Sequence, residues 1–326
     1  MAAHLGPTRG TEMTAPAHEH VGGGLVHEAM PYRDEGEYLA GIVSVVRSAW
    51  AADQRVLVEV PAPRGELVRD ALGTDAAQVE FGDMTEDGRN PGRIIPVLFQ
   101  FAAAHPGRHL AMISEPMWPA RSAHAYTAVV QHEALVNLAF AGQHATVVCP
   151  YNVSELPEHA LVDAERTHPT MLVDGERVAS TRYTDPGVIV EEVYEQLPTP
   201  PPDAEVFDFT VVAKARQVVF DWATRTGLPA GRVTDLLIAV SEIGGNSIIH
   251  GRAGATLLTW TEDDWLICEI RDKGHITDPL AGRVPPPIMA EAGRGLLMVN
   301  YLCDLVQLRT GPTGTAIRLW MNLPED

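Results

Sequence analysis

The sequence predicts two domains: an α/β front domain with a mostly parallel sheet, followed by an α+β rear domain. Three observations predict this arrangement. Strand-like and helix-like segments alternate up to about residue 195, a proline-rich stretch follows, and the order of elements changes beyond it. The length of 326 residues also suits about two domains. The expected boundaries are 1–24 for a disordered tail, 25–195 for the front domain, 196–204 for a linker and 205–326 for the rear domain.

In the front domain, short apolar runs alternate with longer segments of helical periodicity. We expect strands at 55–60, 78–81, 110–113 and 145–149, and helices at 66–72, 92–104 and 121–141. The last of these strands is expected to end before Pro150. Strands that alternate with helices indicate βαβ units and therefore a mostly parallel sheet.

The linker contains four prolines within residues 197–203, which favours a stiff, extended connection. Beyond it we expect helices at 212–226 and 231–250, a hairpin of strands at 255–260 and 265–271, a helix from about 295, and strands at 305–310 and 315–321. Helices on one face of a mixed sheet give the α+β prediction.

Charge and composition exclude several classes of function. The chain carries 24 basic and 43 acidic residues, a net charge of −19, which repels the phosphates of nucleic acids and anionic lipids. The sequence has no apolar run long enough for a transmembrane helix and no secretory signal at its start. Its three scattered cysteines predict free thiols. We therefore expect a cytoplasmic protein that binds neither nucleic acid nor membrane.

Glu242 and Asn246 are notable within the predicted helix 231–250. They lie one turn apart on the face opposite the apolar stripe. An amide oxygen suits Mg²⁺, and a carboxylate can accept a proton from a hydroxyl group. The same pair also fits an ordinary solvated helix face, so its meaning depends on the motifs that follow it.

Three glycine-containing motifs follow this pair. Asp272 ends a predicted strand just before Gly274, so its carboxylate can accept a hydrogen bond from an amino group while the backbone passes close by. Glycines before a helix allow backbone N–H groups to cradle phosphates. Each motif also fits an ordinary turn. The other motif residues are Gly293, Arg294 and Gly295 before the predicted helix, and Gly314 and Thr315 in the last hairpin.

Together the four motifs resemble, in order and spacing, the nucleotide-binding boxes of GHKL ATPases, over roughly residues 205–323. Residues 242–251 resemble the N box, 272–274 the G1 box, 293–296 the G2 box and 314–315 the last box. The resemblance implies an α/β sandwich of the GHKL (Bergerat) type that binds ATP and Mg²⁺.

The resemblance also implies a role for each motif residue. Glu242 would be the base towards a substrate hydroxyl, Asn246 would chelate Mg²⁺, and Asp272 would hold the adenine amino group. The other implied nucleotide-binding residues are Gly274, Gly293 and Gly295, which shape the loops, Arg294, which touches phosphate, and Gly314 with Thr315 near the adenine. One departure from the family is Gly244-Gly245 inside the helix, where bulkier residues are usual, and we expect close packing of Gly244 on the sheet to compensate.

Among GHKL proteins, the chain looks most like the anti-sigma-factor serine kinases of Gram-positive bacteria. His250-Gly251, Asp278-Pro279 and the Gly-Arg-Gly-Leu sequence at 293–296 carry this likeness. It implies a protein serine/threonine kinase that sequesters a sigma factor and phosphorylates a STAS-type anti-anti-sigma protein, and it is compatible with a homodimer. One alternative is a non-catalytic switch with ATP as a structural ligand. A weaker alternative is a histidine kinase, although no helical hairpin with a phosphoacceptor histidine precedes the linker.

Residues 25–185 resemble the MEDS sensory domain of methanogen and methylotroph regulators. The matching pieces are Asn90-Pro91, residues 114–118, Glu133 with Asn137, and residues 149–152. The resemblance implies an unidentified small-molecule ligand. Ligands of open parallel sheets bind at the carboxyl ends of strands, where the candidate pocket residues are Glu115, Trp118, Tyr151 and Asn152.

The alternatives in the front domain are structural. Strand-end turns explain polar residues such as Asn152 equally well, and Trp118 also fits a core position. The histidines are dispersed without the spacing that is usual at zinc sites, so we expect no zinc site from them. Cys149 is expected to be a buried, unreactive thiol.

Overall fold

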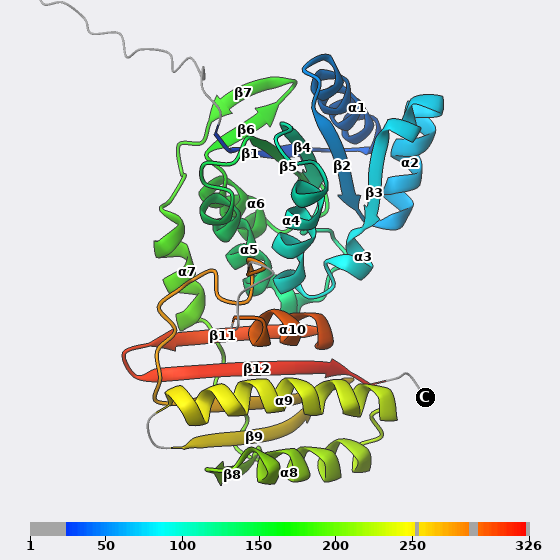
Figure 1. Cartoon of the computed structure of the whole chain (residues 1–326). Coiled ribbons are helices and arrows are strands. Elements are labelled where there is room, and N and C mark those ends of the chain that lie inside the picture. Colours follow the sequence, from blue (N-terminus) through cyan, green and yellow to red (C-terminus); the bar gives the residue numbers. More distant parts are fainter. Residues whose placement is uncertain (1–23, 252–253, 287–292, 324–326) are drawn as a thin grey trace, which may run out of the picture.

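The computed structural model describes residues 24–251, 254–286 and 293–323. It contains a seven-stranded sheet and a five-stranded sheet, each with its own helices, which form the upper and lower halves of Figure 1. Within the described ranges, no helix is both long and apolar enough to cross a lipid bilayer. The expected tail at 1–24 lies almost entirely outside the described residues.

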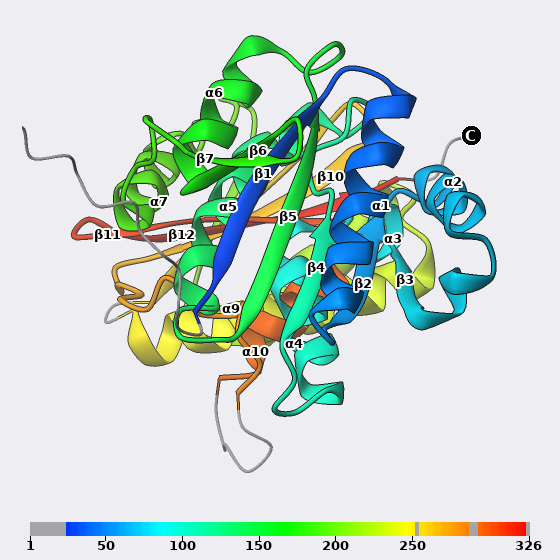
Figure 2. The ribbon, with the colours of Figure 1, turned by 90° about the horizontal axis from the view of Figure 1, so that it is seen from above.

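The front sheet has the strand order β3-β2-β4-β5-β1-β6-β7. All neighbouring pairs are parallel except β6 and β7, which confirms the predicted mostly parallel sheet. Figure 2 shows β5 in the middle, next to β1 and β4. The strands are β1 (Val26–Tyr32), β2 (Arg55–Val60), β3 (Val79–Asp83), β4 (Leu110–Ser114), β5 (Ala145–Asn152), β6 (Thr170–Val173) and β7 (Glu176–Ala179).

Helices cover both faces of the front sheet, which explains why its central strands are apolar almost throughout. Two helices, α1 (Glu35–Ala51) and α2 (Ala62–Leu72), pack on one face. The opposite face, towards the rear domain, is covered by α4 (Ile94–Ala104), α5 (Tyr126–Ala139), α6 (Glu158–Thr167) and α7 (Pro186–Glu195). Short helical turns complete the domain: η1 (Gly73–Gln78), α3 (Met84–Asp87), η2 (Pro91–Arg93) and η3 (Ala123–Ala125).

Strand β5 does not end before Pro150, contrary to the prediction, but runs to Asn152. Val153 N–H donates to Tyr32 O of β1 (2.9 Å). Backbone amides point to the two neighbouring strands in turn along β5, so position 150, three residues earlier, faces β4. The pairing of β5 with β4 ends at Val148. Pro150 has no N–H to donate on that side, so the β4–β5 ladder stops there, while β5 stays paired with β1 up to Asn152.

The rear sheet has the order β11-β12-β10-β9-β8, and all four pairs are antiparallel rather than mixed as predicted. Short turns make β9–β10 and β11–β12 antiparallel hairpins. Two helices connect β8 to β9 and return the chain in the opposite direction. The strands are β8 (Glu205–Phe209), β9 (Ala255–Glu262), β10 (Trp265–Asp272), β11 (Leu305–Gly311) and β12 (Gly314–Asn322).

Three helices cover one face of the rear sheet and confirm the predicted α+β sandwich: α8 (Val212–Arg225), α9 (Ala230–His250) and α10 (Gly295–Leu302). The other face packs on the front domain. There Ala125 at the end of η3 and Ala128 in the first turn of α5 lie in one apolar cluster with Trp260 and Trp320 of the sheet. Across the same boundary, Arg318 donates to the carbonyl oxygen of Pro198 in the linker (2.6 Å). The two domains are thus in direct contact and are not joined by the linker alone.

Candidate functional site

Helix α9 directs its polar face away from the rear sheet, as its periodicity predicted. It buries an apolar stripe that includes Leu236, Val240 and Ile243. On the other side Glu242 is half-buried and Asn246 is exposed, one turn further along. The two groups that were predicted to act together therefore do stand side by side at the surface of the domain.

Gly295, the first residue of α10, lies against this pair. A Cβ atom at Gly295 would be 2.6 Å from Glu242 Oε2 and 3.7 Å from Asn246 Nδ2, so a side chain there would displace the carboxylate of Glu242. The absence of a side chain leaves the N–H groups at the start of α10 next to Glu242 and Asn246. Such a helix start, with its positive end of the dipole, attracts anionic groups such as phosphates.

Asp272 is fixed beside α9 by two hydrogen bonds. Ser247 Oγ donates to Asp272 Oδ2 (2.6 Å), and the N–H of Gly274 donates to Oδ1 (2.6 Å). A carboxylate has about four acceptor sites, so both oxygens can accept further hydrogen bonds. This leaves Asp272 able to accept a hydrogen bond from an exocyclic amino group.

At the start of β12, the backbone of Gly314 and Thr315 lies close to Asp272. Thr315 pairs with Asp272 across the β10–β12 ladder, and its hydroxyl donates to the carbonyl oxygen of Gly274 (3.0 Å). Gly314 has a φ of +127°, and a Cβ there would be 2.2 Å from the carbonyl oxygen of Asp272. Glycine is required at 314 for both its conformation and the close approach.

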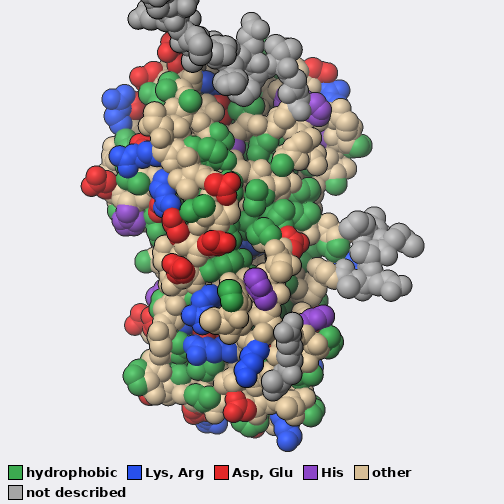
Figure 3. All heavy atoms as spheres, turned by 90° about the vertical axis from the view of Figure 1, so that its left-hand side faces the viewer, with side chains coloured by type: hydrophobic (Ala, Val, Ile, Leu, Met, Phe, Trp, Pro, Cys, Tyr) green, Lys and Arg blue, Asp and Glu red, His purple; other side chains and the backbone are tan. Residues whose placement is uncertain are grey.

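Gly293 and Arg294 lie at the start of α10, on the same side as Gly295. Gly293 has a φ of +93°, which favours glycine, and both residues are exposed. Figure 3 shows the face at the C-terminal end of α9, where basic side chains gather over the rear domain and acidic ones lie above them on the front domain. Positive charge on this face suits a polyanionic ligand.

These groups fit a magnesium–nucleotide. An exposed amide oxygen of Asn246 suits Mg²⁺, which prefers oxygen ligands and keeps several waters. Asp272 offers acceptors for an amino group, and the space at Gly295 is one that a Cβ would fill.

The segment between β10 and α10, which we call the lid segment (residues 276–286 as described), is bound to the front domain. The buried guanidinium of Arg283 donates to Gln131 Oε1 on α5 (2.8 Å), and burial lowers the pKa of Arg283 to about 10. Leu280 and Val284 pack against the apolar core of the front domain.

Asn300 of α10 adds a second link. Asn90 of the front domain donates to the Asn300 carbonyl (2.9 Å), and Asn300 Nδ2 donates to the carbonyl of Gly282 in the lid segment (2.9 Å). The loops expected to enclose a nucleotide are thus held by the front domain.

Sequence reasoning missed three of these supporting residues. Ser247 lies on the buried, apolar side of α9, yet its hydroxyl donates to Asp272. Thr310, whose hydroxyl contacts that of Thr315 (2.8 Å), and Arg283 carried no motif at all. Only Ser247 had a usable signal, because it directly follows Asn246 in the N box.

The four candidate pocket residues of the front domain do not gather at one point. Glu115 is buried and accepts from the hydroxyls of Tyr32 (3.1 Å) and Tyr38 (3.2 Å). Burial raises the pKa of Glu115 to about 7, opposed by Arg64 and by the two tyrosine hydrogen bonds. Tyr32 and Tyr38 belong to the core under α1 and α2.

The other three residues point elsewhere. Tyr151 belongs to the core on the opposite face of the sheet, where its hydroxyl donates to Glu133 Oε1 (3.0 Å). Trp118 packs on that core with Arg121 stacked over its ring, and Asn152 accepts from the N–H of Ser154 in a turn. Successive residues of a strand direct their side chains to opposite faces of the sheet, so Tyr151 and Asn152 point apart. A shared ligand pocket for the four residues stays a prediction.

A cavity of about 540 Å³ does lie in the front domain, between α1, β1 and the β6–β7 hairpin. Its walls include Met30, Ser44, Leu172 and Arg177. That volume lies within the range of about 300–1,000 Å³ that is usual for small-molecule sites. None of the four candidate pocket residues lines it.

Two family models match the chain and confirm both resemblances. Residues 26–169 match the MEthanogen/methylotroph, DcmR Sensory (MEDS) domain, and residues 207–321 match the histidine kinase-like ATPase domain. The chain therefore carries a MEDS domain followed by a histidine kinase-like ATPase domain. No curated protein matches it.

Several solved structures align with parts of this chain. The RsbU and RsbW domains of Rv1364c from Mycobacterium tuberculosis align at 20% identity and a TM-score of 0.29, over 40% of this chain and 34% of that one. The SiaB–SiaC complex from Pseudomonas aeruginosa aligns at 12% identity and a TM-score of 0.29, over 36% and 88%. The histidine kinase AdeS of Acinetobacter baumannii aligns at 10% identity and a TM-score of 0.24, over 61% and 96%. This chain thus spans 34% of the length of the first of these proteins.

Proposed function

We propose that the rear domain binds ATP with Mg²⁺ and transfers its γ-phosphoryl group to a serine or threonine hydroxyl of a partner protein. The observation that carries this proposal is the arrangement of Glu242, Asn246 and Gly295, in which a carboxylate and an amide face the bare start of α10. The match of residues 207–321 to the histidine kinase-like ATPase model supports the nucleotide.

The site residues divide the work of phosphoryl transfer. Bound ATP with Mg²⁺ supplies the phosphoryl group and offsets the charge of the phosphates. Asn246 would hold the metal through its amide oxygen, and Asp272 would accept a hydrogen bond from the adenine amino group. Glu242 would take the proton of the attacking hydroxyl as that oxygen bonds to the γ-phosphorus and the bond to the bridging oxygen breaks, which releases ADP.

We infer the partners from the resemblance of the motifs to anti-sigma-factor serine kinases. A small STAS-type anti-anti-sigma protein would be the phosphorylated substrate, and a sigma factor would be sequestered, in the cytoplasm. The MEDS domain would bias the kinase when it binds a small molecule. Contact between Arg283 and Gln131, at the boundary of the lid segment and α5, supplies a direct route for that bias.

The second candidate is a non-catalytic switch, in which nucleotide binding alone changes partner affinity. The observation that favours it is the attachment of the lid segment to the front domain, since nucleotide binding can then be transmitted without chemistry. The two candidates share the ATP site and differ only in the role of Glu242.

A labelling experiment separates the candidates. Full-length protein is incubated with γ-labelled ATP, Mg²⁺ and a STAS-type protein, and label transfer is measured. We expect Glu242→Gln to reduce transfer by at least about 100-fold, as for loss of a general base, while ATP binding persists. Glu262→Gln, an exposed glutamate at the end of β9, is the matched control and should leave transfer unchanged.

Three results would change the assignment. Unchanged labelling in Glu242→Gln would remove that residue as the base. ATP binding by the wild-type protein without any label transfer would favour the non-catalytic switch, and acid-labile label on histidine would favour a histidine kinase. Asn246→Ala should weaken the Mg²⁺-dependent thermal stabilisation by ATP.

A further inference from the structure

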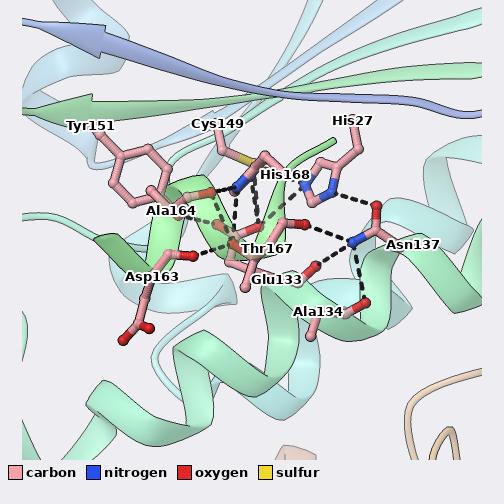
Figure 4. Close-up of polar contacts among 10 residues, drawn as sticks. All are labelled: His27, Glu133, Ala134, Asn137, Cys149, Tyr151, Asp163, Ala164, Thr167 and His168. Carbon is pink, nitrogen blue, oxygen red and sulfur yellow. Dashed lines mark hydrogen bonds and ion pairs between the residues drawn. The ribbon is translucent and has the colours of Figure 1, made fainter. Parts of the chain in front are cut away.

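Four side chains that can bind metals meet inside the front domain, between the sheet and the helices that face the rear domain (Figure 4). They are His27 on β1, Glu133 on α5, Cys149 on β5 and His168 directly after α6. Each is at most 1% exposed. The cluster does not line the 540 Å³ cavity and belongs to a different domain from the nucleotide site.

Four of the six distances between these atoms match those around one four-coordinate metal ion. Glu133 Oε2 is 3.3 Å from His27 Nε2 and 3.4 Å from His168 Nε2. Cys149 Sγ is 3.5 Å from the same Glu133 oxygen and 3.6 Å from His27 Nε2, and all four atoms lie within 4.8 Å of one another. Ligand atoms bound at about 2.0–2.3 Å in a tetrahedral zinc site are separated by about 3.3–3.8 Å.

Hydrogen bonds at the far side of each ring direct the nitrogen lone pairs into the cluster. His168 Nδ1 is 2.8 Å from the carbonyl oxygen of Ala164, which can only accept, so the ring hydrogen is on Nδ1. Asn137 donates its amide to Thr167 O (2.8 Å), so its oxygen, 3.1 Å from His27 Nδ1, is the acceptor there too. Both Nε2 atoms therefore present lone pairs, as in metal sites whose histidines are oriented by outer hydrogen bonds.

With both imidazoles neutral and no cation present, the centre of the cluster holds too many acceptors. Two nitrogen lone pairs and a carboxylate oxygen then converge, and the thiol hydrogen of Cys149 is the single donor among the four groups. Glu133 Oε1 accepts from Tyr151, and within the described residues His168 Nε2 has no hydrogen-bond partner. A buried carboxylate that faces lone pairs is strongly unfavourable unless a positive charge lies between them.

We propose that His27, Glu133, Cys149 and His168 bind a single divalent transition-metal ion, with zinc as the best match to the ligand set. Imidazole, thiolate and carboxylate are the ligands that zinc uses in proteins. Binding releases the thiol proton of Cys149 to solvent and forms four metal–ligand bonds. The protein supplies all four ligands, so the site is closed, which is typical of zinc sites that hold a fold together.

Metal analysis of the full-length protein tests this proposal. Protein purified without chelator is expected to contain about one zinc per chain by mass spectrometry of the elements. After chelator treatment, added Co²⁺ should produce the thiolate-to-cobalt charge-transfer band in the near ultraviolet. Cys149→Ser should lose this band, whereas Cys268→Ser, at an equally buried free cysteine of the rear domain, should keep it.

A milder variant tests the site without removing any of the four ligands, so that loss of metal does not merely reflect misfolding. Asn137→Ala keeps all four ligands and removes the hydrogen bond to His27 together with the amide's bonds to backbone carbonyls, including Thr167 O. It should weaken zinc affinity by about 10- to 100-fold, as for loss of an outer hydrogen bond. The proposal is overturned if wild-type protein contains no metal and the chelator-treated form takes up neither Zn²⁺ nor Co²⁺. It is equally overturned if Cys149→Ser retains the full metal content and the cobalt band.

Discussion

The two domains place the carboxylates of their candidate sites in opposite ways. In the rear domain the groups assigned to the nucleotide stand at the rim, since Asn246 is exposed and Glu242 and Asp272 are half-buried. In the front domain four glutamates, Glu28, Glu59, Glu115 and Glu133, are at most 2% exposed. An open rim suits a large charged ligand that arrives from water, whereas the enclosed Glu133 cluster has room for an ion or a proton.

The buried glutamates of the front domain are accommodated by different means. Glu28 is paired with the guanidinium of Arg177 (2.6 Å). Burial, followed by the charges of Asp87 and Asp83, raises the pKa of Glu59 to about 8, so it is largely protonated at neutral pH. Glu133 has no lysine or arginine within ion-pair distance among the described residues and faces two histidines instead. A metal ion bound by Glu133 would supply the positive charge that no lysine or arginine provides there.

The largest expected difference in the free energy of unfolding is between Glu133→Gln and Glu242→Gln. Replacing Glu133 removes the buried anion and a proposed metal ligand, so we expect the free energy of unfolding to fall by about 3 kcal/mol or more. The same change at half-buried Glu242 should alter it by less than about 0.5 kcal/mol. Urea unfolding followed by fluorescence measures both. Equal effects in the two variants would contradict the contrast between the domains.

A smaller effect should appear at the boundary between the domains. Arg283→Met removes the hydrogen bond to Gln131 and loosens the lid segment, which must then be ordered when a nucleotide binds. We expect ATP affinity to fall by at least about fivefold, at the lower end of usual coupling between sites. Calorimetry with Arg309→Met, an exposed arginine on β11, as control checks this. Unchanged affinity in Arg283→Met would show that the front domain does not act through this contact.

The smallest effect concerns the two glycines inside α9. A Cβ at Gly245 would meet nothing within 4 Å, so Gly245→Ala should stabilise the helix by up to about 1 kcal/mol. A Cβ at Gly244 would be 3.3 Å from the buried ring of Phe209, so Gly244→Ala should gain less or lose stability. Thermal unfolding without nucleotide compares them, and a larger gain for Gly244→Ala would refute the packing explanation.

The sequence by itself determined the elements of the rear domain except strand β8, and it supplied the residues of the candidate site. Local spacing places Glu242 and Asn246 on one face of a helix. The resemblance to the GHKL boxes, and not spacing, joined the other motif residues to them. Helix α9 and the hairpin of β9 and β10 appear within a few residues of the predicted bounds. Both domain assignments followed from such short, ordered motifs.

Only the tertiary structure decided what lies inside the front domain and between the domains. His27, Glu133, Cys149 and His168 are far apart in sequence and carry no metal-binding spacing, yet a parallel sheet brings β1 beside β5 and α5 beneath them. The attachment of Arg283 to α5 was equally invisible, because nothing in a sequence states which surfaces of two domains meet. Local periodicity fixes the face on which a side chain lies, but the order of strands in a sheet and the packing of domains decide which faces come together.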